Sequence, residues 1–394
     1  MSNHIDKEYK SIKAKLILFF KGFSMGAADI IPGVSGGTIA LISGIYEHLI
    51  FALSSINAKE VIQFLKSLIR KSQNKHNIPF VFLITLVAGI STGILSMSRI
   101  IPFFMEEYPF YTYSLFFGLI LFSIFIPYKK MEHGIIEYIL IIVFAIIIFF
   151  ITSINPYKNF YIQIEISDQI KTIKIDDSGK FQFIIPANQA ENLTIYLQKN
   201  QKNLLTITTF EPDKHFSIEQ DSISLFLRTK SHQEFLEVKG NLSQKGFFYI
   251  LEKGIGKYIW IFFVASIAIC AMILPGISGA YILVLFGEYQ NILKALYEKQ
   301  IDILFVFILG IVTGILSFVR LLKYLLQKYH SYTMAALTGF LVGSLNKIFP
   351  GRYIDHKPET NEILIAIFIA FVGGILLFLL EKLSQKIGDP EPPI

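Results

Sequence analysis

Six long apolar stretches constrain this chain more than any other feature of its sequence. They cover residues 78–105, 109–127, 134–154, 301–322, 331–349 and 362–380. Each reaches the roughly 18 nearly uncharged residues that a helix needs to cross a bilayer. None alternates between apolar and polar residues, as the strands of a membrane barrel do. Because only 17% of all residues are charged, the sequence predicts an all-α polytopic membrane protein.

Two short segments interrupt apolar sequence with proline, glycine and hydroxyl residues. The first break, ADIIPGVSGGT, covers residues 28–38, and the second break, MILPGISGAY, covers residues 272–281. Four positions of the first break recur in the second at a constant separation of 243 positions: Pro32, Gly33, Ser35 and Gly36 correspond to Pro275, Gly276, Ser278 and Gly279.

A further match follows each break. The segment GISTGILSMSR, residues 89–99, resembles GIVTGILSFVR, residues 310–320, at a separation of 221 positions. The two separations differ by 22 positions, and the polar stretch 57–77 can absorb that difference as a loop. We therefore predict an internal duplication, with a first membrane repeat at residues 1–154, a second at 245–394, and an unrelated insert at 155–244.

The duplication also predicts how the two halves are oriented. Each half has a break flanked by two apolar limbs, followed by three predicted spans. The two limbs either dip into the membrane and return, or both cross it. In either case the chain is on the same side of the membrane before and after the pair of limbs. Three spans then give each half an odd number of crossings. The predicted fold is therefore an inverted repeat, each half being a broken or re-entrant helix pair plus three transmembrane helices.

Loop charges assign the two sides of the membrane. With a cytoplasmic N-terminus, the inner segments 1–21, 57–77, 128–133, 323–330 and 382–394 hold 16 Lys and Arg, against four in the short outer loops. This bias predicts that both termini lie in the cytoplasm and that the insert is extracytoplasmic. It also accounts for the net charge of +6 without a nucleic-acid partner.

The insert has a different pattern from the rest of the chain. Residues 161–186 alternate between apolar and polar side chains, and DDSG at 176–179 is typical of a hairpin turn. The pattern predicts a small extracytoplasmic β-domain between the two membrane halves.

The two breaks are candidates for an anion site. Non-helical backbone at membrane depth persists only when it is buried in protein or lines a cavity. Pro32, Gly33, Pro275 and Gly276 would interrupt the helices, and the helix after each break would begin with free amide groups carrying partial positive charge. Phosphate is a common ligand of such ends. The predicted phosphate-binding residues of the two breaks are Ser35, Gly36, Gly37, Thr38, Ser278 and Gly279. The alternative is that the small residues only allow close helix packing.

Charged residues near the breaks complete the predicted site. Arg99 and Arg320 occupy equivalent positions in apolar helices, and arginine suits phosphate geometrically; the alternative is that both extend to the interface. Asp29 is a candidate for coupling or gating, with Glu47 and Glu288 as weaker ones. Proton or sodium coupling is left open, and no metal or other cofactor is expected.

The break sequences resemble a known family. DIIPGVSGGTIALISGIYEHLI and ILPGISGAYILVLFGEYQNIL are similar to the paired signatures of the PopT-type polyprenyl-phosphate transporters. The resemblance implies a flippase that returns undecaprenyl phosphate across the bacterial cytoplasmic membrane for cell-wall synthesis. It places the family motif on Asp29 and on the proline, glycine, serine and threonine residues of the two breaks.

Two rival functions stay open at this point. A transporter or channel for a small soluble anion needs the same site without a lateral opening to lipid. A membrane enzyme such as a lipid phosphatase needs a nucleophile with an acid or base, or a metal cluster. No predicted span contains histidine, so we expect that the protein is not an enzyme. A homo-oligomer is left open.

Overall fold

The computed structural model describes residues 5–6, 8–9, 11–31, 34–56, 78–154, 255–353 and 358–385, together with eight strands between residues 160 and 244. The predicted breaking residues Pro32 and Gly33 and the loop 57–77 lie outside the described residues. The chain divides into two compact units. The first comprises Met1–Ser153, Ala265–Gly279 and Ile308–Ile394, and the second comprises Ile154–Val264 and Ala280–Phe307.

The protein is a multi-pass membrane protein. Among the described residues, six helical segments are long and apolar enough to span a bilayer: α6 (Phe80–Met97), α8 with α9 (Pro109–Ser123 and Phe125–Lys129), α10 (Ile135–Ser153), α11 (Ile255–Ile273), α14 (Ile301–Lys328) and α16 (Thr360–Gln385). The short helices α3 (Gly36–Ile42) and α4 (Tyr46–Ser54) form a further apolar pair bent by 116°.

One predicted span is shorter than its apolar stretch. Residues 331–349 contribute α15 (His330–Ser344), a helix of 15 residues, followed by a turn and the 3-10 helix η2 (Pro350–Arg352). The limb before the second break, by contrast, is the 19-residue helix α11. The limb before the first break is α2 (Ile12–Asp29), which includes three lysines and an aspartate. The remaining helices are α7 (Ile100–Glu107), α12 (Gly279–Leu285) and α13 (Tyr289–Tyr297).

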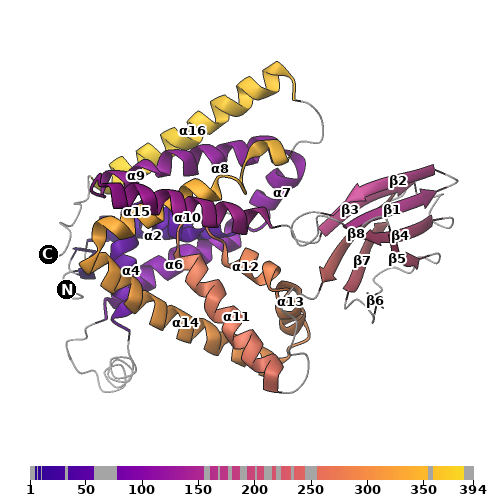
Figure 1. The fold of residues 1–394 in the computed structure, drawn as a ribbon, viewed down its shortest axis with the longest axis horizontal. Helices are drawn as coiled ribbons and strands as arrows, with labels where there is room; N and C mark the ends of the chain where they lie inside the picture. Colours follow the sequence, from indigo (N-terminus) through magenta and orange to yellow (C-terminus); the bar gives the residue numbers. More distant parts are fainter. Residues whose placement is uncertain are drawn as a thin grey trace. The chain divides into compact units, whose positions relative to one another are not determined.

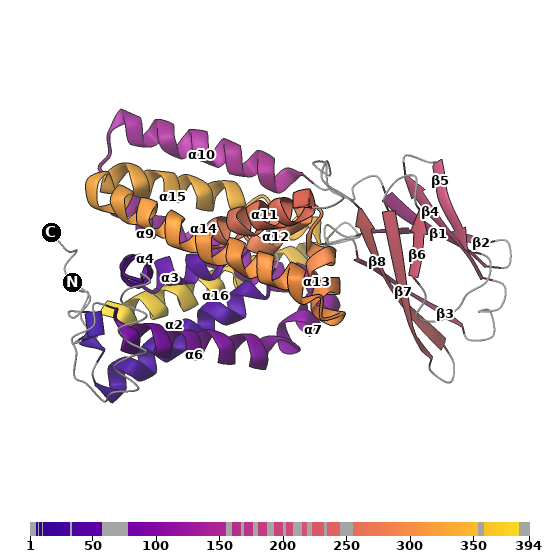
Figure 2. The same ribbon diagram turned by 90° about the horizontal axis from the view of Figure 1, so that it is seen from below.

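The helices of the first unit pair across the predicted halves. Helix α8 packs along α16 (Figure 1). Helix α15 packs along α10 (Figures 1 and 2). In the predicted duplication α8 corresponds to α15, and α10 corresponds to α16. Each pair therefore joins the helix of the second predicted span in one half to that of the third predicted span in the other.

Glycine contacts recur at equivalent positions of the two halves. A Cβ atom on Gly93 of α6 would lie 2.9 Å from the carbonyl carbon of Phe23 in α2, so the two backbones touch there. A Cβ on Gly314 of α14 would lie 2.7 Å from the carbonyl oxygen of Ser266 in α11. Gly314 and Ser266 are the predicted counterparts of Gly93 and Phe23, so the same close packing is used twice. The opposite membrane orientation of the halves stays a prediction.

The core of the first unit surrounds the first break. All seven residues of α3 are buried. The helix packs against α2, α4, α8, α9 and α16. Helix α3, which begins within the first break, is therefore enclosed by protein. Irregular backbone within a membrane needs such a setting unless it lines a cavity.

The insert is the predicted small β-domain and belongs to the second unit. Its strands are β1 (Phe160–Ile166), β2 (Gln169–Lys174), β3 (Lys180–Pro186), β4 (Leu193–Lys199), β5 (Lys202–Ile207), β6 (His215–Ile218), β7 (Ile223–Ser231) and β8 (Phe235–Gln244). They form two antiparallel sheets in the orders β2-β1-β4-β5 and β3-β8-β7-β6.

The predicted turn at residues 176–179 lies outside the described residues, but the strands that flank it do not form the predicted hairpin. Strands β2 and β3 flank that segment but belong to different sheets, since β2 pairs with β1 and β3 pairs with β8. The alternation of Ile162 and Ile164 in β1 does place both side chains in the domain core. The alternation of apolar and polar residues therefore identified the strands. The turn sequence alone did not determine with which strands β2 and β3 pair.

We expect Gly93→Val to destabilise the protein by about 1–3 kcal/mol, because the added side chain meets the backbone of α2. Thermal unfolding of the purified protein in detergent measures the effect. Leu95→Val is the matched control, since Leu95 lies on the same helix and is 78% exposed. Equal melting temperatures for the two variants would contradict this close packing.

Candidate functional site at the paired chain breaks

The first break joins the end of α2 to the start of α3. Helix α2 ends at Asp29, and Ser35 caps α3 from an extended conformation with φ −125° and ψ 139°. The Ser35 hydroxyl oxygen accepts a hydrogen bond from the Gly37 amide at 3.1 Å. The Asp29 carboxylate accepts one from the Gly36 amide at 2.6 Å. Both groups act as N-terminal caps, which serine and aspartate favour.

Two glycines allow these contacts. A Cβ on Gly36 would lie 2.7 Å from an Asp29 carboxylate oxygen, so any larger residue would push the carboxylate away. A Cβ on Gly37 would lie 2.6 Å from the carbonyl oxygen of Ile273, the last residue of α11. Glycine at 37 therefore lets the carbonyl end of α11 approach the amide end of α3, an arrangement that the two helix dipoles favour.

The second break follows α11 and turns at a glycine. Gly276 has φ +86°, a left-handed conformation that glycine adopts without a Cβ clash. A side chain there would also approach the Ser344 hydroxyl of α15, at 2.8 Å from the Cβ. The break ends at Ser278, which is 8% exposed, immediately before α12.

Two hydrogen bonds join the breaks directly. The Ser35 hydroxyl donates to the Met272 carbonyl at 2.8 Å, and the Gly276 amide donates to the Thr38 hydroxyl oxygen at 2.9 Å. Ser35 and Thr38 are both fully buried, at 0% exposure. The two breaks thus lie against each other, and each provides hydrogen-bond partners for polar groups of the other.

The predicted free amides at the start of α3 are not found. The Gly36 amide is bonded to Asp29, the Gly37 amide to the Ser35 side chain, and the Thr38 amide to the Ser35 carbonyl at 2.9 Å. The physical reason is that Asp29 supplies a carboxylate, the kind of group that a helix N-terminus attracts. In this conformation a protein anion therefore occupies the place predicted for phosphate, and phosphate binding by these residues stays a prediction.

The structure does not bring the two arginines to the breaks. Arg99 is exposed and precedes α7, and Arg320 is exposed within α14. In the part of the chain that the structure describes, neither guanidinium forms a hydrogen bond or ion pair with a break residue. Their predicted contact with a phosphate is untested.

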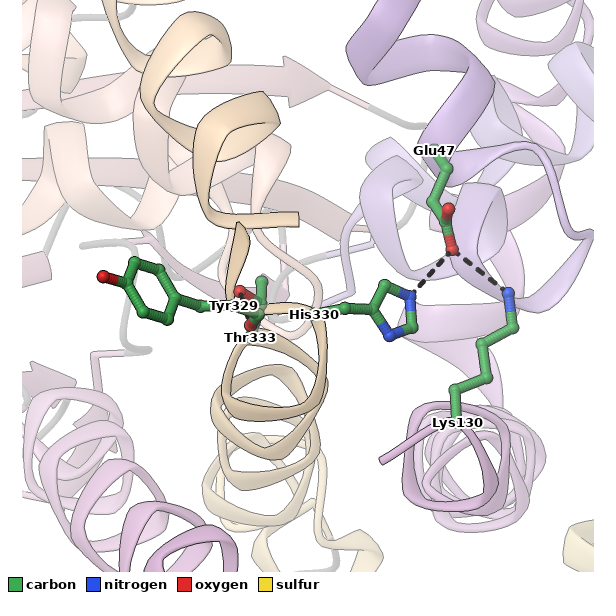
Figure 3. A network of polar contacts seen from close by, with 5 residues as sticks. All are labelled: Glu47, Lys130, Tyr329, His330 and Thr333. Atoms are coloured by element: carbon green, nitrogen blue, oxygen red, sulfur yellow. Dashed lines mark hydrogen bonds and ion pairs between the residues drawn. The ribbon is translucent and has the colours of Figure 1, made fainter. Parts of the chain in front are cut away.

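Glu47 belongs to a separate polar network (Figure 3). Its carboxylate lies 3.3 Å from the Lys130 ammonium nitrogen and 3.5 Å from the Nε2 of His330. Lys130 follows α9, and His330 begins α15, so Glu47 links the start of α4 to two other helices. The sequence did not predict this network because its members are far apart in the chain.

Glu288, the other predicted acid, lies in the second unit. It is 3% exposed, and its carboxylate accepts a hydrogen bond from the Asn291 side chain at 3.1 Å. It precedes α13, where this bond fixes the first turn of the helix. A role of Glu288 in coupling is untested.

A multi-pass membrane protein in which two interrupted helices meet inside the bundle has the architecture of a secondary transporter. The sequence profile of the undecaprenyl phosphate translocase-like family matches residues 25–166 and 249–364 of this chain. The match covers both membrane halves and more than half of the chain. The chain therefore belongs to this family.

Two curated relatives carry the same name, polyprenyl-phosphate transporter. The relative from Vibrio cholerae serotype O1 is 30% identical over 338 residues, which is 86% of this chain and 78% of the relative. The relative from Staphylococcus aureus is 26% identical over 380 residues, or 94% and 98% of the two chains. No solved structure matches this chain.

We expect Thr38→Val to destabilise the protein by about 1–3 kcal/mol, because the buried Gly276 amide loses its acceptor. Thr38→Ser keeps the hydroxyl and should lose less. Thermal unfolding in detergent compares the two variants with Thr92→Val, which removes an exposed hydroxyl bonded within its own helix. Equal melting temperatures for Thr38→Val and Thr92→Val would contradict the hydrogen bond between Gly276 and Thr38.

Proposed function

We propose that this protein is a flippase that moves polyprenyl phosphate, in bacteria undecaprenyl phosphate, across the cytoplasmic membrane. Its product would be the carrier lipid at the inner leaflet, ready for the next cell-wall precursor. One observation carries the proposal: in a chain that matches the family over both halves, the two breaks are hydrogen-bonded to each other.

The phosphate would bind where the breaks meet. The Ser35 and Thr38 hydroxyls and the Gly276 amide meet at that point. Hydroxyls and main-chain amides are donors suited to a phosphate group. Because the tail is apolar, it would stay in the bilayer while the headgroup passes between the halves. The binding residues proposed are Ser35, Gly36, Gly37, Thr38, Ser278 and Gly279.

Asp29 gives this site a competitor of its own. Its carboxylate holds the Gly36 amide at 2.6 Å, and a phosphate needs the same donor. Two anions cannot share one helix end, so phosphate binding requires Asp29 to leave or to become neutral. A proton arriving at Asp29, or a sodium ion that draws the carboxylate away, would therefore favour phosphate binding and couple ion movement to transport.

The closed contact between the breaks defines one state of the cycle. The Ser35–Met272 and Thr38–Gly276 hydrogen bonds leave both hydroxyls fully buried. Access for a headgroup requires these bonds to open as one repeat moves against the other. Arg99 near the outer face and Arg320 near the inner face would attract the phosphate at either entrance, and Glu47 and Glu288 would act in gating.

The membrane topology belongs to the same proposal. Both termini would lie in the cytoplasm, the β-domain would lie outside, and the two halves, residues 1–154 and 245–394, would be inverted. The bias of basic residues among the loops supports this orientation. The protein would act as a transporter without covalent chemistry on its lipid.

We expect the double variant Ser35→Ala with Ser278→Ala to reduce transport at least about tenfold, a loss of about 1.4 kcal/mol in transition-state stabilisation. Uptake of a fluorescent short-chain polyprenyl phosphate into proteoliposomes measures it. The matched control is Ser96→Ala with Ser317→Ala, an equivalent pair whose hydroxyls donate within their own helices.

Two results would contradict the proposal in this assay. Unchanged uptake by the Ser35 and Ser278 variant would remove the breaks from the site. Inorganic phosphate competing as strongly as the short-chain lipid would favour a transporter for a small soluble anion.

We expect Asp29→Asn to bind the phosphate lipid about five- to tenfold more tightly, since a neutral amide holds the Gly36 N–H about 1 kcal/mol less strongly. Uptake by this variant should also stop responding to a pH or sodium gradient. Equilibrium binding to the purified protein and uptake at several gradients measure the two effects. Asp6→Asn is the control, because Asp6 likewise accepts from a backbone amide, that of Phe82. Weaker binding by Asp29→Asn would contradict competition and favour a direct role in holding the substrate.

A further inference from the structure

A cavity of about 420 Å³ lies between α8–α9 and α16 in the first unit. No residue of either break lines it. Its wall combines apolar side chains with two lysines, and its lining consists of Phe122, Phe125, Ile126, Lys129, Gly374, Leu377, Phe378 and Lys382. We call it the α9–α16 groove.

The apolar part of the groove opens towards lipid. Phe125 is 56% exposed and Phe378 is 61% exposed, and both belong to helices that can span a bilayer. Gly374 forms part of the floor, because a Cβ there would lie 2.5 Å from the Phe122 ring. These apolar side chains have the chemistry needed to contact an acyl chain lying along the helices.

The two lysines lie at one end of the groove. Lys129 is the last residue of α9, and Lys382 lies in the last turn of α16, beyond the apolar span that ends at Leu379. Within the described ranges neither lysine forms an ion pair, whereas the adjacent Lys130 is paired with Glu47. A lysine near a helix C-terminus is favoured by the helix dipole. The helix dipole accounts for each lysine on its own helix. It does not account for the fact that both lysines line the same apolar groove.

We propose that the groove binds an anionic glycerophospholipid of the inner leaflet. One acyl chain lies against Phe122, Phe125 and Phe378, and the phosphodiester lies between Lys129 and Lys382. Basic pockets between helices on the cytoplasmic side bind such headgroups. The inference rests here on the orientation given under the proposed function, which would put both lysines on that side. Because α9 and α16 come from different halves, the bound lipid would contact both halves. It would lie where one half must move against the other during the proposed transport cycle.

Native mass spectrometry tests the proposal on the full chain, purified in mild detergent and supplied with phosphatidylglycerol or phosphatidylcholine. Lys129→Gln with Lys382→Gln should reduce retained phosphatidylglycerol at least about fivefold, or about 1 kcal/mol, and leave phosphatidylcholine unchanged. Lys13→Gln with Lys15→Gln removes the same charge from two exposed lysines of α2 and should have no effect. Phe125→Ala changes no charge and should also lower retention of phosphatidylglycerol.

Three outcomes would overturn the proposal. Phosphatidylglycerol could be retained equally by the Lys129 and Lys382 variant and by wild type. Both lysine pairs could lower retention alike, which would indicate a general effect of charge. Undecaprenyl phosphate, supplied in a separate arm, could need Lys129 and Lys382 when phosphatidylglycerol does not, which would assign the groove to the substrate path. The flippase proposal does not depend on any of these results.

Discussion

The fold depends on how two interrupted helices satisfy their backbone groups away from water. A broken helix leaves amides and carbonyls that hydrocarbon cannot hydrogen-bond, and each unsatisfied group there costs several kcal/mol. Here the breaks serve each other: the Met272 carbonyl receives the Ser35 hydroxyl, and the Gly276 amide binds the Thr38 oxygen. This exchange requires both halves of the chain, so the breaks and the pairing of the halves stabilise one another. Among the described residues, two hydrogen bonds and close packing join the breaks, and the proposed transport cycle would require them to separate.

Asp29 explains why an acid stands next to a predicted anion site. Its carboxylate occupies the positive end of α3 and caps the Gly36 amide. Met272 stands at the equivalent position of the second break, so only one of the two half-sites carries its own anion. In the proposed mechanism, this asymmetry would let one site exchange a protein carboxylate for a substrate phosphate while the other keeps its geometry. Such an exchange would link ion movement to substrate binding through the Asp29 side chain.

Much of the fold could be predicted because apolar length and repeated spacing are local properties of a sequence. The spans, the β-rich insert and the meeting of the breaks follow from them, and Gly93 and Gly314 recur at equivalent contacts. Other features depend on long-range geometry. The link from Glu47 to Lys130 and His330 joins three helices that no spacing rule relates. That the Gly36 amide is already hydrogen-bonded could be known only from the position of the Asp29 side chain. Helix α15 is short because its apolar stretch continues into a turn and η2. Strands β2 and β3 pair with other strands because whole sheets, rather than one turn sequence, decide strand partners.

The central claim is that the paired breaks hold the lipid phosphate in place of Asp29. An experimental structure of the protein in lipid nanodiscs with a bound polyprenyl phosphate tests it most directly. The account predicts phosphate oxygens within hydrogen-bonding distance of the Gly36 and Gly37 amides, with the Asp29 carboxylate displaced from Gly36. Phosphate bound elsewhere, with Asp29 still on the Gly36 amide and the Thr38–Gly276 bond intact, would contradict it.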